Sequence, residues 1–225
     1  VITLDARRFI PQSRPRLFLI GAQTPVNGGE QDTCLRPDSV AWLHEDPEVD
    51  TFMMPLPKAP ELVSEGFTGL VESIPSNDCR WWNEEKVSSF VESMSPGQRE
   101  RLESFIGGKK LTARTAYRRT RGGIPVWEMR SEDISGCLRT PRGGSSKQAV
   151  VVMGKNALNI RWMTGSEYAR LMGAGWFSLD GLRDSQIQYG FGDAVAVPVV
   201  EWVAKNMVTP NLKSSITGTR IKVSV

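Results

Sequence analysis

Apolar side chains recur at helical spacing in the stretch before residue 107, and they predict two successive helices. The first, over 84–94, carries its apolar side chains on one face: Val87, Phe90, Val91 and Met94. Ser95-Pro96 is typical of a helix start, because serine accepts from unpaired amides and proline at the first helical position loses no hydrogen bond. The second helix is predicted to end at Gly107-Gly108 and to bury Leu102, Phe105 and Ile106. We expect both apolar stripes to lie in the core.

Short apolar and β-branched runs bounded by turn residues predict strands. Residues 1–5 form the first such run, and the continuous apolar run over 17–20 is typical of an interior strand covered on both faces. Between 22 and 80 the chain is rich in Pro, Gly, Asp and Glu, which predicts loops with one short helix near 39–44. Further strand-like runs follow at 124–127 and 149–153.

The clearest helix start is at Thr164, which precedes Glu167 by three residues. That spacing is a capping box, in which the hydroxyl and the carboxylate each accept from an unpaired amide. Tyr168, Leu171 and Met172 then follow at helical spacing, and Gly173 is a typical C-terminal stop. We therefore predict a short capped helix over 165–172.

A tight turn is predicted at Gly190–Asp193, leading into an apolar helix that places Pro198 in its first turn. The tail over 209–225 is polar with a last strand-like run, so a poorly ordered end and an added edge strand both remain open.

The net charge of the chain is only +3, but the charges are unevenly distributed. Residues 22–100 carry 15 Asp and Glu against 5 Lys and Arg, a balance of −10. Residues 109–147 carry 10 Lys and Arg against 3 Asp and Glu, a balance of +7. A local basic block is expected of a surface that faces phosphates, and the alternative is a solvated charged face.

Within the basic block, two segments rich in arginine and glycine are predicted to be loops that contact DNA. Glycine lets the backbone approach a duplex, and arginine forks onto a guanine edge or a phosphate pair. The alternative is two flexible surface loops. The predicted contacts are Arg118, Arg119, Arg121, Gly122 and Gly123 in the first loop, and Arg139, Thr140, Arg142, Gly143, Gly144, Ser145 and Ser146 in the second.

Other candidate residues favour structural roles. Trp81 and Trp82 are adjacent, so at most one points fully inward, and we favour packing in a core or interface over stacking on a base. The single histidine, His44, is predicted to be a surface or packing residue. The three cysteines are widely spaced, so a zinc site is not predicted, and their odd number is typical of a reducing compartment. No run approaches the ~20 apolar residues of a membrane span, which predicts an intracellular, cytoplasmic protein without a membrane partner.

Three segments together resemble the eighth, ninth and tenth motifs of the cytosine-5 DNA methyltransferase family. The eighth reads Gln-x-Arg-x-Arg before a strand, and here stands as Gln12, Arg14 and Arg16. The family's ninth motif appears as Arg161, Met163-Thr164, Glu167, Arg170-Leu171 and Gly173. The tenth appears as Gly192-Asp193-Ala194-Val195 with Val197-Pro198, where the family has Asn in place of Asp193. Cys137-Leu138 stands where the family often has Thr-Leu, at the end of its recognition region.

The resemblance implies an α/β fold: the C-terminal part of a Rossmann-like sheet that uses S-adenosylmethionine, plus a mixed, loop-rich target recognition domain. Residues 1–21 would end the catalytic domain, 22–158 would form the recognition domain, and 159–208 would return to the catalytic domain. Catalytic roles are implied for Gln12, Arg14 and Arg16, and a cofactor-binding role for Asp193, Ala194 and Val195. Arg161, Glu167 and Arg170 are predicted to be structural, held in buried ion pairs.

Parts of the family's machinery have no counterpart in the sequence. No cysteine follows a proline, so the Pro-Cys nucleophile is absent from these residues, as are the glycine-rich cofactor turn and the Glu-Asn-Val motif. We therefore expect a C-terminal segment of a longer enzyme or the second subunit of a split one, inactive without the N-terminal half and tightly associated with it. Expected context includes base flipping, DNA methylation and a restriction-modification system in a prokaryote or phage. The alternatives are a non-catalytic DNA-binding module and a tRNA cytosine-5 methyltransferase relative.

Overall fold

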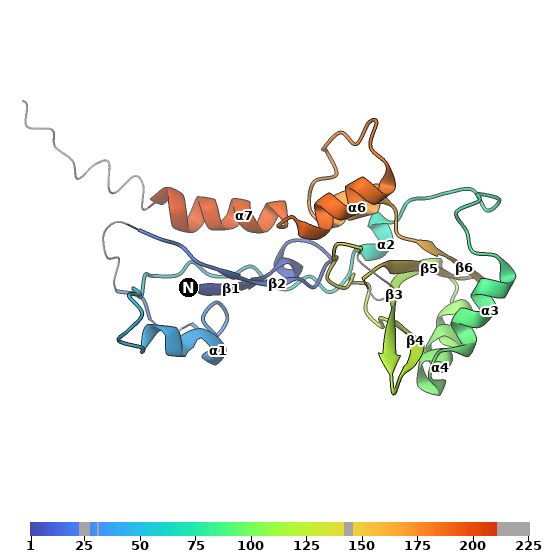
Figure 1. Ribbon diagram of the computed structural model, residues 1–225, viewed down its shortest axis with the longest axis horizontal. Coiled ribbons are helices and arrows are strands. Elements are labelled where there is room, and N and C mark those ends of the chain that lie inside the picture. The colour runs from blue at the N-terminus through green and yellow to red at the C-terminus, as the bar shows by residue number, and fades with distance from the viewer. Residues whose placement is uncertain (23–27, 31, 142–145, 211–225) are drawn as a thin grey trace, which may run out of the picture. The chain divides into compact units, whose positions relative to one another are not determined.

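A computed structural model describes residues 1–22, 28–30, 32–141 and 146–210 of the chain (Figure 1). The fold is mixed α/β, and every strand pair in it is antiparallel. The chain divides into two compact units. Unit 1 comprises 1–9, 15–62 and 197–225, and unit 2 comprises 10–14 and 63–196. The sequence-based boundaries at 21 and 158 do not coincide with this division, because 22–62 groups with the first strands and 159–196 with the predicted recognition region.

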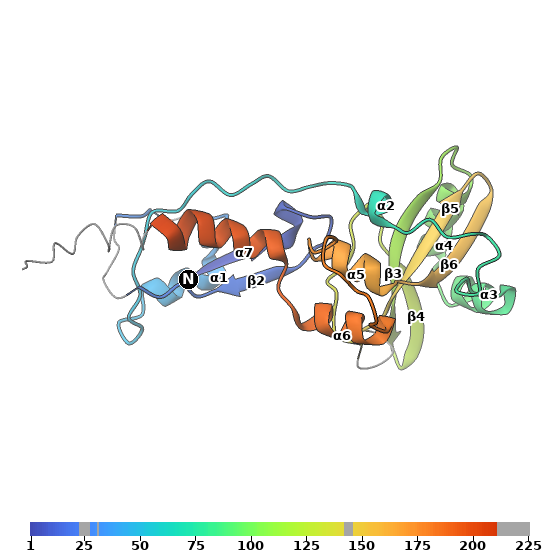
Figure 2. The ribbon, with the colours of Figure 1, turned by 90° about the horizontal axis from the view of Figure 1, so that it is seen from above.

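Unit 1 is built on an antiparallel pair of strands, β1 (Ile2–Asp5) and β2 (Pro15–Phe18), joined through the 3-10 turn η1 (Ala6–Arg8). Helix α7 (Val197–Val203), with its continuation η3 (Ala204–Val208), runs alongside this pair (Figures 1 and 2). The expected short helix is present as α1 (Asp38–Ala41) and η2 (Trp42–His44). Pro198 lies in the first turn of α7, as predicted.

The expectation of a buried strand over 17–20 is wrong for the described structure. Leu17 in β2 is 51% exposed and Leu19 beyond it is 77% exposed. Buried and half-buried residues alternate along β1 but not along β2. In β1, Ile2 and Leu4 face the core. The apolar side chains of Leu17 and Leu19 are therefore exposed surface that no described residue covers, and the strand is not enclosed on both faces.

Unit 2 contains a four-stranded antiparallel sheet in the order β4-β3-β5-β6. Its strands are β3 (Thr112–Arg121), β4 (Ile124–Met129), β5 (Gln148–Gly154) and β6 (Ala157–Trp162). The apolar run in β5 is almost wholly buried, since the strand is central and covered on both faces. Both helices predicted before residue 107 are present, as α3 (Glu84–Glu92) and α4 (Pro96–Ile106).

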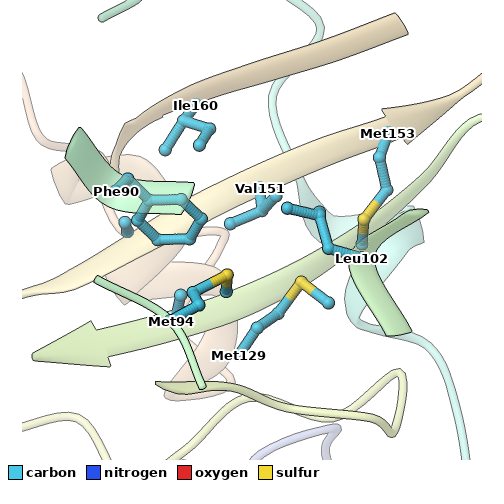
Figure 3. Packing of buried hydrophobic residues seen from close by; sticks show 9 residues of the cluster. Phe90, Met94, Leu102, Met129, Val151, Met153 and Ile160 are labelled. Atoms are coloured by element: carbon cyan, nitrogen blue, oxygen red, sulfur yellow. The ribbon is translucent and has the colours of Figure 1, made fainter. Parts of the chain in front are cut away.

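Helices α3 and α4 supply the apolar layer that covers one face of this sheet. Phe90, Met94 and Leu102 from the helical region meet Met129 of β4 and Val151 of β5 in one core cluster (Figure 3). The cluster confirms that the two apolar stripes are core. A short helix, α2 (Phe67–Leu70), also contacts β3.

The ninth-motif segment forms helix α5 (Gly165–Leu171), whose capping box is present as predicted. Glu167 closes the box and also pairs with Arg161 of β6, at 2.5 and 2.8 Å, while both side chains are almost fully buried. The carboxylate accepts further bonds from the amides of Thr164 and Glu72, each at 2.9 Å. Arg170 donates to the carbonyl of Leu70 at 3.0 Å. This buried pair joins β6, α5 and the loop before α3 into one body.

The turn predicted at Gly190–Asp193 is wrong, because these residues are the last turn of helix α6 (Asp184–Asp193). The helix buries Ile187 and Gln188, and Gln188 donates to the carbonyl of Met163 at 2.7 Å. Two glycines reduce helix propensity, but this packing outweighs their cost of about 1 kcal/mol each. None of the helices in the described ranges has the length and apolar character needed to cross a membrane.

Replacing Glu167 with glutamine should destabilise unit 2 by about 3–5 kcal/mol, because it leaves the Arg161 charge buried without its counter-ion. Urea unfolding followed by tryptophan fluorescence measures the change. The matched control is Glu132→Gln, whose partner Arg130 lies at 3.3 Å in a surface pair. That control should cost less than about 1 kcal/mol. Equal effects from the two substitutions would contradict the structural role of the buried pair.

Burial raises the pKa of Tyr168 to about 12, and its buried hydroxyl has no hydrogen-bond partner among the described residues. Between pH 10 and 12 the unfolded chain releases this proton and the folded chain does not, so stability falls as pH rises. Tyr168→Phe should be nearly neutral at pH 7 and should remove a loss of about 2–3 kcal/mol at pH 12. Urea unfolding at both pH values tests this, and an unchanged alkaline loss in the variant would refute it.

Candidate functional site

A short segment of the eighth motif, residues 10–14, runs through unit 2 and contacts the chain around Ser135. Ser13 donates its amide to the carbonyl of Ser135 at 3.0 Å, and the amide of Ser135 donates to Pro11 at 2.8 Å. Two such bonds from one residue form a parallel bridge with Gln12 at its centre. The segment is therefore fixed in unit 2, with Gln12 and Arg14 buried inside it.

The Gln12 side chain joins two distant segments of unit 2. Its amide nitrogen donates to the carbonyl of Leu171 at 2.5 Å, and its carbonyl oxygen accepts from the amide of Leu138 at 3.1 Å. The residue is 0% exposed. A buried glutamine has to satisfy both ends of its amide, and here the two ends select the end of α5 and the segment after β4.

Arg14 extends the same arrangement to the end of α6. Its guanidinium donates to the carbonyls of Leu138 at 2.5 Å, Ala194 at 2.6 Å and Gly192 at 3.2 Å, and the residue is only 3% exposed. A planar group with five donors suits three carbonyls that no helix or sheet satisfies. In this structure the Arg14 guanidinium faces main-chain carbonyls, a geometry that suits a residue that positions the segments around it.

The segment after Leu138 also packs directly on the end of α6. Thr140 is buried, and its hydroxyl donates to the carboxylate of Asp193 in a short contact. Gly192 has no space for a side chain, since an added Cβ would lie 2.4 Å from the Thr140 amide nitrogen. The aspartate that departs from the family's asparagine is therefore an acceptor for Thr140. Val195, which the sequence also predicted to contact the cofactor, is 52% exposed.

These contacts leave Arg139 as the exposed residue between two buried neighbours, Leu138 and Thr140. Leu138 is held by Gln12 and Arg14, and Thr140 is held by Asp193. A side chain anchored on both sides loses little backbone entropy when it binds a partner. The arrangement can present one guanidinium to an anionic ligand at a defined position.

The first arginine-rich segment is not a loop, as the sequence predicted, but the end of strand β3 and a two-residue hairpin turn. Gly122 and Gly123 have φ angles of +55° and +85°, which suit the turn that matches the twist of two antiparallel strands. The alternation of a strand then separates the arginines, with Arg118 on one face and Arg119 and Arg121 on the other. All three side chains are exposed.

Glu128 of β4 partly neutralises the face that carries Arg119 and Arg121. It lies 3.1 Å from Arg119 and 2.6 Å from Arg121. Burial acts to raise the pKa of the Glu128 carboxyl, but the hydrogen bonds and charge of Arg121, with smaller contributions from Tyr117 and Arg119, together hold the pKa below its usual value. Glu128 is therefore ionised at neutral pH and competes with any external anion for the two arginines.

The remaining predicted site residues lie in other segments of the chain. Arg16 lies in β2 of unit 1, where it is exposed and donates to the carbonyl of Pro15 at 2.8 Å. Ser146 is half-buried, and the predicted contacts 142–145 lie outside the described residues. In the part of the chain that the structure describes, no group of acidic, cysteine and histidine side chains is arranged to hold a metal ion.

A tryptophan-lined hollow in unit 2 was not anticipated from the sequence. Trp82, Trp127 and Trp162 meet there with two lysines, Lys86 and Lys147. Their positions are spread from 82 to 162 along the sequence, so only the register of the sheet brings them together. Trp82 packs into the aromatic cluster and Trp81 hydrogen-bonds the Pro75 carbonyl at 2.8 Å, and both side chains are half-buried.

Arg14→Met should lower the stability of unit 2 by more than about 2 kcal/mol, because the carbonyls of Leu138, Gly192 and Ala194 lose their donor and the first two are buried, at a cost of about 1–3 kcal/mol for each buried unsatisfied group. Arg16→Met is the matched control, since that side chain is exposed, and its effect should stay within about 0.5 kcal/mol. The urea midpoint measured by tryptophan fluorescence compares the two. A small effect of Arg14→Met would refute the positioning role.

Comparison with known proteins shows the family of this chain. A family model described as C-5 cytosine-specific DNA methylase matches residues 1–209, nearly the whole chain. Neither the curated proteins nor the solved structures give a match. The matched range includes the segments around Gln12, Leu171 and Ala194 that the side chains of Gln12 and Arg14 join in unit 2. The chain therefore belongs to the family of C-5 cytosine-specific DNA methylases.

Proposed function

We propose that this chain is the target-recognition and C-terminal portion of a DNA cytosine-5 methyltransferase, which binds duplex DNA and completes an active site whose nucleophile lies outside these residues. The observation that carries the proposal is the meeting of Leu138, Leu171 and Ala194 on the side chains of Gln12 and Arg14. Three motif segments far apart in sequence thereby hold one exposed arginine, Arg139. Such a design suits a site that must place a DNA contact at a fixed position.

The DNA-binding role rests on exposed guanidinium groups on rigid elements. Arg118, Arg119 and Arg121 project from strand β3, and Arg139 projects from an anchored segment. Contacts from such groups to phosphates fix the register of a protein on the duplex, and a bidentate contact to guanine reads sequence. The pairing of Arg119 and Arg121 with Glu128 weakens the non-specific part of this attraction. We assign base reading first to Arg139. Its position is fixed by bonds to its neighbours Leu138 and Thr140 and not by an ion pair of its own guanidinium.

In the proposed reaction the target cytosine leaves the base stack, at a cost of a few kcal/mol, and a cysteine supplied from outside these residues adds to it. Arg16 is exposed on β2, and we assign it to the phosphates or to the base itself. Its positive charge would stabilise the electron density that builds on the ring during attack. Gln12 and Arg14 act one step away, by holding the segment around Leu138.

Members of the family use S-adenosylmethionine, which supplies the methyl group. Of the three residues predicted to contact it, Asp193 is engaged by Thr140, and the Ala194 carbonyl is engaged by Arg14. The exposed side chain of Val195 fits an apolar wall of such a pocket. The fit of this chain to the cofactor is therefore limited to one edge, which agrees with the absence of a glycine-rich cofactor turn from its sequence.

Methyl transfer tests the proposal directly. The chain is combined with the polypeptide that carries the family's Pro-Cys and cofactor motifs, and labelled methyl groups are followed from S-adenosylmethionine to duplex DNA or tRNA. We expect transfer to DNA only from the combination. DNA binding without transfer would favour a non-catalytic binding module, and transfer to tRNA alone would replace DNA as the substrate.

Arg16→Ala should lower turnover by at least tenfold and leave DNA affinity within about twofold, because its charge acts on the reacting base. Lys205→Ala, another exposed cation of unit 1, is the control.

Two substitutions should move DNA affinity in opposite directions. Arg139→Ala should weaken binding to the modified sequence by about 1–3 kcal/mol and relax the choice of base, because a bidentate contact is lost. Glu128→Gln should strengthen binding to any duplex and steepen its salt dependence, since Arg119 and Arg121 are released from their carboxylate. Fluorescence anisotropy at several salt concentrations measures both. If neither substitution changes affinity, β3 and Arg139 do not form the interface.

A further inference from the structure

Three tryptophans from separate elements form the floor of a hollow in unit 2. Trp82 precedes α3, Trp127 lies in β4 and Trp162 ends β6. Their rings lie 5.1 to 5.8 Å apart between centroids. The hollow above them has a volume of about 500 Å³ and is also lined by Ser89, Pro141 and Gln188. A neighbouring hollow of about 630 Å³ shares Trp82 and Trp162 with it.

Basic side chains stand over these rings. Lys86 lies 4.1 Å from the centroid of Trp82 and 5.0 Å from that of Trp162. Lys147 lies 5.3 Å from the Trp162 centroid, and Arg118 of β3 lines the same hollow. Burial, followed by the charge of Lys147, lowers the pKa of Lys86. The two ammonium groups therefore repel each other, and a bound anion would relieve that repulsion.

Acidic groups offer little competition for these cations. Among the described residues that line the two hollows, Asp184 is the one carboxylate, and it lies in the second hollow. Its Oδ1 accepts from the amide of Gly165 at 3.0 Å, at the start of α5. The three rings are tilted by 44° to 70° to one another, so a flat ring can stack on one of them and meet the edges of the others, beside cations that suit a phosphate.

A nucleotide has this combination of a flat ring and a phosphate, and a volume of about 500 Å³ lies within the range of sites for small molecules. We propose that the tryptophan hollow binds one unstacked nucleotide of the DNA, with its base against Trp82, Trp127 and Trp162 and its phosphate against Lys86 and Lys147. The inference rests on the proposed function, because DNA must be the ligand. Arg118 connects the two sites, since it lines the hollow and lies on the arginine-bearing strand β3.

The test uses the full chain and three fluorescently labelled DNA duplexes of one sequence. The first is fully paired, the second carries a single-nucleotide bulge, and the third carries the same bulge without its base. Stacking contributes about 1–3 kcal/mol per base, so the intact bulge should bind roughly 5- to 150-fold more tightly than the abasic bulge. It should also quench tryptophan fluorescence, whereas the abasic bulge should not.

The double variant Lys86→Met, Lys147→Met retains the long side chains over the rings and removes both charges. It should weaken binding of the intact bulge at least tenfold and leave the affinity for paired duplex within about threefold. Lys109→Met, an exposed lysine outside the hollow, should change neither. Equal affinity for the intact and abasic bulges, without quenching, would overturn the inference. If the fully paired duplex still binds in that case, the proposed function stands. Failure to bind any of the three duplexes would reject both.

Discussion

Buried main-chain groups outside helices and strands must find hydrogen-bond partners, and in unit 2 a few long polar side chains meet this requirement. Gln12 pairs with Leu138 and Leu171, and Arg14 pairs with Leu138, Gly192 and Ala194. Each of these carbonyls or amides would otherwise lose its hydrogen bond to water on folding. Because one side chain satisfies groups from several segments, the segments cannot move independently without leaving polar groups unpaired.

The buried pair of Arg161 and Glu167 applies the same constraint on the other side of helix α5. The carboxylate accepts two main-chain amides besides the guanidinium, so the helix start, strand β6 and the loop at Glu72 share one centre. A buried pair of this kind contributes little net stability over apolar packing, but its removal from one side is costly. It therefore specifies how the segments fit, and it allows the surface residues on them to be held for function.

The sequence predicted best what depends on neighbouring residues. The capping box at Thr164 was readable because its partners lie within one turn, and the start of α4 was readable from Pro96 at its first position, although the Ser95 side chain makes no capping bond there. The sequence did not predict that Gly190–Asp193 is the end of helix α6. Two glycines suggest a turn, and only the packing of Ile187 and Gln188 overrides that preference. No local pattern indicates where a buried side chain finds its partners.

The same limit applies to the candidate site. Gln12 and Arg14 were recognised through a resemblance, but their burial depends on carbonyls more than a hundred residues away along the chain. The arginines of β3 were expected in a loop, and strand pairing instead divides them between two faces. The tryptophan hollow depends on the register that brings Trp127 and Trp162 beside Trp82, so composition alone did not reveal it.

Hydrogen–deuterium exchange of the segment over 134–141 tests the central claim most directly. The claim is that buried side chains, rather than regular secondary structure, hold this segment and its exposed Arg139 in place. In a Gln12→Leu variant, the amide of Leu138 loses its acceptor, so exchange in this segment should accelerate at least tenfold, while exchange in β5 should stay unchanged as an internal reference. Unchanged protection of the segment in that variant, with the protein still folded, would contradict the account.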